Sequence, residues 1–153
     1  EPQDFKVVRH QAMKELANER NTHHWCQYYS PFLTNDIPKQ ADHCTKLLKR
    51  IESGLEEVWL PDLVLADIVW TLEKFYKQPK QRIQELLIPI LELKGLRHNN
   101  KKISKLAFQL YVEKNIDWTD AFVAAQMITQ KKFEIYSYDS DFDKVDGINR
   151  LEP

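Results

Sequence analysis

Apolar residues recur along this chain at spacings that predict helices separated by a few short strands. A period near 3.6 residues indicates an amphipathic helix, whereas a short apolar run bounded by turn residues indicates a strand. The strand pattern occurs in EEVWLP (56–61) and FEIYSY (133–138). Helical spacing predicts helices over residues 5–20, 37–53, 62–77, 79–91, 103–114 and 117–132.

Residues that start or break helices divide the same stretches. Asn35 and Asp36 form a plausible N-cap with a proline close behind, and Gly54 closes that helix. Pro89 should kink or shorten the helix that contains it, and Asn99 and Asn100 mark a break. Strands separated by helices favour an α/β domain with a parallel sheet over a helical bundle.

Composition limits the classes of protein that fit. A chain of 153 residues, 42% of them hydrophobic, can bury one core, so we expect one domain. The net charge of -1 excludes binding to nucleic acid by bulk charge, so any such binding must use local basic clusters such as NNKKISK. No apolar run is long enough for a membrane span and no signal peptide is visible, so we expect a cytoplasmic protein.

Five aspartates stand where the predicted elements begin or end. They are Asp67 in the helix at 62–77, Asp117 and Asp120 in DWTDAFVAAQM, and Asp139 and Asp141 after FEIYSY. Acids at the ends of different elements can converge on one pocket, and converging carboxylates bind a hard divalent cation. Metal-dependent phosphodiester chemistry is therefore the leading hypothesis.

Each acid also has a purely structural interpretation. Asp139 and Asp141 could cap the turn DSDFDK, and we assign Asp117 mainly the role of helix N-cap. Asp120, one turn later, complements the helix dipole, but we assign it mainly the chemical role. Asp67 is either buried among core residues, where it would need a partner or an ion, or it lies on a polar stripe.

Histidines and cysteines give a weaker signal. Their positions match no regular zinc spacing, so an ordinary structural role is favoured for His23, His24, Cys26, His43 and Cys44. No glycine-rich phosphate loop and no GxSxG motif occurs.

Three blocks together resemble the PIN-domain nucleases, and specifically the VapC-like ribonuclease toxins. These blocks are LPDLVLADIVWTLEKFY, AFQLYVEKNIDWTDAFVAAQM and FEIYSYDSDFDKVDGINRLEP, and the resemblance covers residues 32–153. It implies a PIN-like three-layer α/β fold with a central parallel sheet and helices on both faces. It also implies RNA hydrolysis with Mg²⁺ or Mn²⁺, a cognate antitoxin as partner and a homodimer.

Matched position by position, the resemblance assigns the metal site. Asp67 occupies a position that the family usually fills with Glu, and Asp120 matches the acid before the small apolar helix. Asp139 and Asp141 match the final acid pair, with Ser137 at the usual Ser/Thr position. The implied catalytic acids are Asp67, Asp120 and Asp139, and Asp141 joins them as a metal ligand.

One family element is absent from the sequence. The first strand should carry an Asp and an Asn, but His24 and Cys26 stand in their places. If the codons of residues 24–31 are read one nucleotide later, the genetic code permits nearly the missing strand, with Gly in place of the Asp. We therefore hypothesise that residues 1–31 include a frameshifted segment before a nuclease domain at 32–153. The alternative function is a catalytically impaired PIN-like module that binds RNA or a protein partner.

Overall fold

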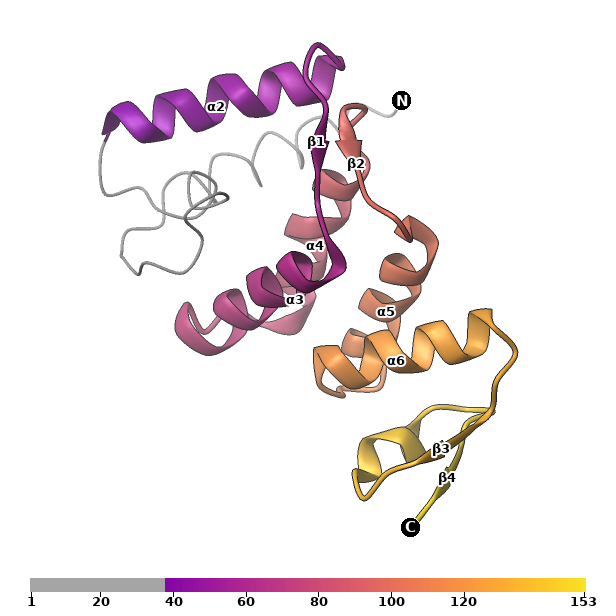
Figure 1. Cartoon of the computed structure of the whole chain (residues 1–153). Helices are drawn as coiled ribbons and strands as arrows, with labels where there is room; N and C mark the ends of the chain where they lie inside the picture. Colours follow the sequence, from indigo (N-terminus) through magenta and orange to yellow (C-terminus); the bar gives the residue numbers. More distant parts are fainter. Residues whose placement is uncertain (1–37) are drawn as a thin grey trace. The chain divides into compact units, whose positions relative to one another are not determined.

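The computed structural model describes residues 38–153, with side chains from Lys46 onward (Figure 1). Three predictions therefore lie outside the described residues: the helix at 5–20, the N-cap at Asn35 and Asp36, and the altered strand at residues 24–31. The side chains of His43 and Cys44 lie outside them as well.

Helices alternate with short parallel strands, which confirms the predicted α/β class. Along the chain the described elements are α2 (Pro38–Ser53), β1 (Val58–Trp59), α3 (Asp62–Trp70), the π-helix η2 (Thr71–Phe75), α4 (Lys80–Leu91), β2 (Leu96–Arg97), α5 (Lys101–Glu113), α6 (Trp118–Thr129), β3 (Glu134–Tyr136), the 3₁₀-helix η3 (Ser140–Lys144) and β4 (Asn149–Leu151).

The strands form two parallel pairs. In the first, Val58 of β1 lies opposite Leu96 of β2. In the second, β3 lies beside β4, with Glu134 opposite Asn149 and Tyr136 opposite Leu151. The predicted strands at 56–61 and 133–138 are thus confirmed as β1 and β3. Strands β2 and β4 were not predicted, because their sequences, LR and NRL, include polar residues and show no apolar run that would mark a strand.

One helix differs from its predicted form, and another keeps its predicted range although a proline lies inside it. The helix predicted over residues 62–77 is α-helical only through Trp70 and continues as the π-turn η2, in which the Tyr76 N–H bonds to the Thr71 carbonyl. Helix α4 includes Pro89 and extends to Leu91, so the proline does not stop it at once. Pro89 has no N–H to donate, and the helix ends two residues later.

Contacts divide the described residues into two compact units, and the first contains residues 38–59 together with 85–97. Helix α2 ends at Ser53 and is followed by Gly54, whose φ of +76° is a left-handed conformation that costs glycine little. The backbone of Gly95 lies against the turn that contains Glu56: a Cβ at Gly95 would lie 2.0 Å from the Glu56 carbonyl oxygen. Only glycine fits at this position, next to the β1–β2 pair.

The second unit contains residues 60–84 and 98–153. Helices α5 and α6 pack against each other around Trp118, whose ring lies 4.4 Å from that of Phe108 and 5.8 Å from that of Tyr111. On α6 the fully buried Ala121 and Ala124 add only methyl groups, which permits a close approach between helices. This packing fixes the first turn of α6, which carries Asp120.

A buried histidine ties the start of the second unit to α5. His98 Nδ1 lies 2.7 Å from the Leu60 carbonyl oxygen, and Nε2 lies 2.7 Å from Ser104 Oγ. Because a carbonyl oxygen only accepts, Nδ1 carries a proton, and Nε2 shares a hydrogen bond with the Ser104 hydroxyl and lies 3.4 Å from Asp62 Oδ1. Both polar side chains are thereby satisfied inside the core.

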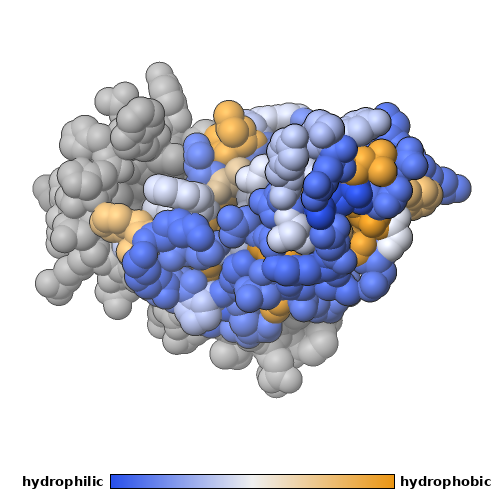
Figure 2. Space-filling view, turned by 90° about the horizontal axis from the view of Figure 1, so that it is seen from below, coloured by the Kyte–Doolittle hydropathy of each residue, from blue (hydrophilic) through white to orange (hydrophobic). Residues whose placement is uncertain are grey.

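The face shown in Figure 2 is mostly hydrophilic, and its apolar residues form separate patches. Among the described residues, none of the helices has the length and apolarity that a membrane crossing requires.

Candidate metal centre

Strand β3 leads directly into a turn that carries two aspartates. Asp139 is the N-cap of η3, and its Oδ1 accepts a hydrogen bond of 2.9 Å from the Asp141 N–H. The Asp139 N–H donates in turn to Ser137 Oγ at 3.0 Å. The predicted capping role of Asp139 is therefore confirmed. A cap does not exclude metal binding, because each carboxylate oxygen has more than one lone pair.

Asp141 is held from two sides. Its Oδ1 lies 2.6 Å from Lys144 Nζ, one turn further along η3, and its Oδ2 accepts from the Asp117 N–H at 3.2 Å. The Lys144 hydrogen bond lowers the pKa of Asp141; burial acts in the opposite direction, and the Asp117 N–H and the Lys80 charge reinforce the lowering. Asp141 is therefore a carboxylate at neutral pH.

Asp120 projects from the first turn of α6 and is half-buried. Burial raises its pKa above the ordinary aspartate value, and repulsion from Asp139, Asp141 and Asp117 raises it further. In the described part of the chain, no ion pair or hydrogen bond neutralises the Asp120 carboxylate. The negative charge at this position is therefore uncompensated.

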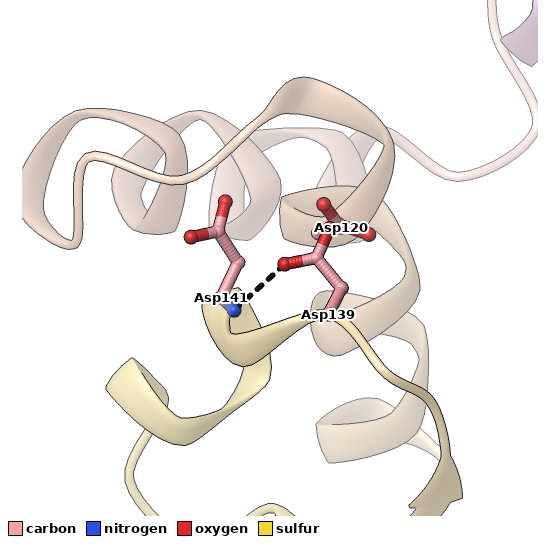
Figure 3. A group of neighbouring side chains, drawn as sticks. All are labelled: Asp120, Asp139 and Asp141. Atoms are coloured by element: carbon pink, nitrogen blue, oxygen red, sulfur yellow. Dashed lines mark hydrogen bonds between the residues drawn. The ribbon is translucent and has the colours of Figure 1, made fainter.

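These three acids form one group (Figure 3). Each contributes a carboxylate oxygen, and the three oxygens all lie within 4.8 Å of one another. Asp120 approaches from α6, whereas Asp139 and Asp141 approach from the turn after β3, so the group depends on how α6 and η3 pack. We call Asp120, Asp139 and Asp141 the acid group.

Two other predicted acids lie outside the acid group. Asp117 occupies the N-cap position of α6, but its side chain makes no capping hydrogen bond, so the role assigned to that side chain is wrong. Asp67 is exposed on α3, on the same side as Leu63 and Trp70, which are 75% and 62% exposed. The interpretation of Asp67 as a buried acid is therefore wrong, while its catalytic role stays a prediction.

Sequence reasoning missed the cations beside the acid group. Lys144 is the clearest, and its position three residues after Asp141 on a helical turn was a signal that could have found it. Lys80 belongs to the basic run KFYKQPKQR, but its position could not have been found, because the fold alone brings its Nζ to 2.6 Å from the Ile116 carbonyl oxygen and 4.7 Å from the centre of the Tyr111 ring.

Another acid, Glu73, holds two side chains near the acid group in place. The buried Tyr111 hydroxyl donates to Glu73 at 2.6 Å, and Lys74 Nζ lies 2.9 Å from the other Glu73 oxygen. Burial alone would raise the pKa of Glu73, but the hydrogen bonds from Tyr111 and Lys74 outweigh it and the pKa is lowered. The same Lys74 ammonium lies 4.0 Å from Asp117 Oδ1, next to the acid group.

The acid group suits a hard divalent cation. Mg²⁺ and Mn²⁺ prefer carboxylate oxygens, and all three side chains supply them. A cation would also relieve the repulsion that raises the pKa of Asp120. These residues therefore fit a divalent metal ion.

Carboxylates gathered at the end of a parallel strand in an α/β domain define a class of candidate metal-dependent hydrolases. Comparison with known families narrows this class: the model of the PIN domain family matches residues 33–148. Because the match covers most of the chain, the protein belongs to the PIN domain family. PIN domains are generally nucleases that require a divalent metal and act on RNA. No curated protein and no solved structure gives a significant match.

Proposed function

We propose that this protein is a metal-dependent endoribonuclease of the VapC-like toxin type, which hydrolyses RNA phosphodiester bonds. The observation that carries the proposal is the convergence of three carboxylates within 4.8 Å in a chain of the PIN domain family. These acids are separated in the sequence, and α6 and η3 bring them together. The toxin assignment rests on the sequence blocks that resemble VapC-like proteins.

In this proposal Asp120, Asp139 and Asp141 hold Mg²⁺ or Mn²⁺. A divalent cation bound there would activate water and neutralise charge on the phosphate. The Asp141 N–H orients Asp139, and the Asp117 N–H orients Asp141, so backbone groups fix the directions of two ligands. Asp67 is proposed as a further acid of the site on the resemblance alone.

The remaining parts of the proposal follow from the toxin type. A VapC-like nuclease would be inhibited by a cognate antitoxin, would form a homodimer and would act in the cytoplasm. The family match begins at residue 33, which supports a nuclease domain starting near residue 32. For residues 1–31 we retain the hypothesis of a frameshifted segment. The coding DNA tests it: the hypothesis is refuted if the codons for Gln27, Tyr28 and Tyr29 do not give Asn-Ile-Ile in the shifted frame.

A second candidate function is an impaired PIN-like module that still binds RNA or a protein partner. Two observations favour it. Asp67 is not part of the acid group, and the carboxylate of Asp141 is already paired with Lys144. Fewer free carboxylates would weaken metal binding and therefore cleavage.

The test is cleavage of single-stranded RNA by the full chain, with Mn²⁺ or with EDTA. We expect cleavage only with metal, and we expect Asp120→Asn and Asp139→Asn to abolish it. The matched control is Asp143→Asn, because Asp143 lies on the same short helix but pairs with Arg150. Unchanged cleavage in both site variants would refute the nuclease assignment, and RNA binding without cleavage would favour the impaired module.

A further inference from the structure

Lys144 is the cation closest to the acid group. Its Nζ lies 2.6 Å from Asp141 Oδ1, and its side chain is 47% exposed whereas that of Asp141 is 21% exposed. The hydrogen bond with Asp141 raises the pKa of Lys144, and the charges of Asp141, Asp139 and Asp117 raise it further. The function proposed above assigns it no role.

The position of this ammonium conflicts with metal binding. Asp141 has two carboxylate oxygens: Oδ2 accepts the Asp117 N–H, and Oδ1 accepts Lys144. A divalent ion that used Oδ1 would meet an oxygen already paired with a full positive charge, and one that used the remaining lone pair of Oδ2 would still lie close to that ammonium. Two cations sharing one carboxylate oxygen repel each other, and the ion is bound by several acids whereas Lys144 makes one short contact.

We infer that Lys144 is a built-in counter-ion of Asp141, which a divalent cation displaces when it binds the acid group. The inference rests on the proposed metal site and adds the regulation of that site. Without metal, Lys144 reduces the repulsion among the acids and stabilises the folded chain. With metal, its ammonium leaves Oδ1, and its exposed side chain has room to move towards solvent.

Displacement makes a linked pair of predictions. Removing the ammonium by Lys144→Met should lower the free energy of unfolding of the metal-free protein. It should tighten Mn²⁺ binding by the same amount of free energy. Because a partly exposed ion pair contributes modestly, we expect binding to tighten about two-fold to five-fold. At saturating Mn²⁺ the stabilities of the variant and the wild type should converge, because Lys144 no longer pairs with Asp141 in either protein. Lys144→Arg keeps the charge and should restore the wild-type affinity.

The chain offers a closely matched control. Lys114 forms an ion pair of nearly the same length, 2.7 Å, with Asp146, and neither residue belongs to the acid group. Lys114→Met removes the same charge and an ion pair of similar length with a more exposed acid, and its effect on stability should be the same with and without Mn²⁺. A change in total charge alone would act similarly in both variants.

The experiment is a calorimetric Mn²⁺ titration together with urea unfolding in EDTA and in excess Mn²⁺, for the wild type, both methionine variants and Lys144→Arg. Tighter binding and converging stabilities in Lys144→Met only would support displacement. The inference would be overturned if Lys144→Met bound Mn²⁺ with unchanged or weaker affinity and still differed from the wild type in stability in excess Mn²⁺. That outcome would leave the proposed metal site intact. If wild-type protein binds no Mn²⁺, the inference and the proposed function fail together.

Discussion

Replacing Asp120 by Asn should stabilise the metal-free protein, although it removes a residue of the proposed site. The Asp120 carboxylate faces two other carboxylates within 4.8 Å, and its charge has no partner among the described residues. Two unit charges at that separation repel by about 1 kcal/mol in water and about 3.5 kcal/mol at an effective dielectric constant near 20. The acids are partly exposed and Lys144 compensates Asp141, so the lower figure applies. We expect Asp120→Asn to gain about 1 kcal/mol in free energy of unfolding, or about 2–4 °C in Tm.

The pH dependence gives this prediction its sign. The pKa of Asp120 is raised in the folded protein, so the charged carboxylate opposes folding at pH values above that pKa. Lowering the pH through the raised pKa protonates Asp120 and removes the penalty in the wild type. The advantage of Asp120→Asn should therefore be largest near neutral pH and should disappear as the pH falls.

The assay is urea unfolding in EDTA across a pH series, with Asp146→Asn as the control. Lys114 lowers the pKa of the exposed Asp146, so asparagine there should give no gain at neutral pH. In excess Mn²⁺ the wild type should be more stable than Asp120→Asn, because only the wild type gains binding energy from the ion. A metal-free Asp120→Asn protein that is less stable than the wild type at neutral pH would refute the account of uncompensated charge.

Three further substitutions test the surrounding structure. Ser104→Ala should cost about 1–3 kcal/mol in urea unfolding, because it removes the 2.7 Å hydrogen bond of the buried His98 Nε2 and leaves this nitrogen with Asp62 Oδ1 at 3.4 Å; an unchanged stability would contradict the hydrogen bond. Gly95→Ala should cost about 3 kcal/mol, because its Cβ would lie 2.0 Å from a backbone oxygen, and a neutral effect would show that the turn can move. Tyr111→Phe should raise the pKa of Glu73, measured by carboxyl NMR titration, since a hydrogen bond that lowers it is lost; an unchanged pKa would exclude that contact.

Much of the fold could be predicted because helical periodicity is a local property. The breaks at Gly54 and Asn100 and the strands β1 and β3 are confirmed at or near the predicted positions. Strands β2 and β4 could not be predicted, since their short, partly polar sequences contain no apolar run and only their pairing with β1 and β3 makes them strands. The π-turn η2 was missed because its apolar spacing resembles that of an α-helix.

The acid group was predictable in part. Asp120, Asp139 and Asp141 each stand at the start of an element, and that position alone indicated convergence. One of the two alternatives for Asp67 was burial, and it is wrong because the side chain is exposed. Flanking apolar residues do not show which side of a helix is covered. The partners of these acids, Lys144 above all, depend on side-chain geometry that periodicity does not contain.

The central claim is that the acid group holds a divalent cation, and calorimetric titration of the full chain with Mn²⁺ tests it most directly. We predict saturable binding at one site below roughly millimolar metal, weakened at least about ten-fold by Asp139→Asn and unchanged by Asp143→Asn. Wild-type protein that releases or absorbs no heat of binding up to roughly millimolar Mn²⁺ would contradict the claim.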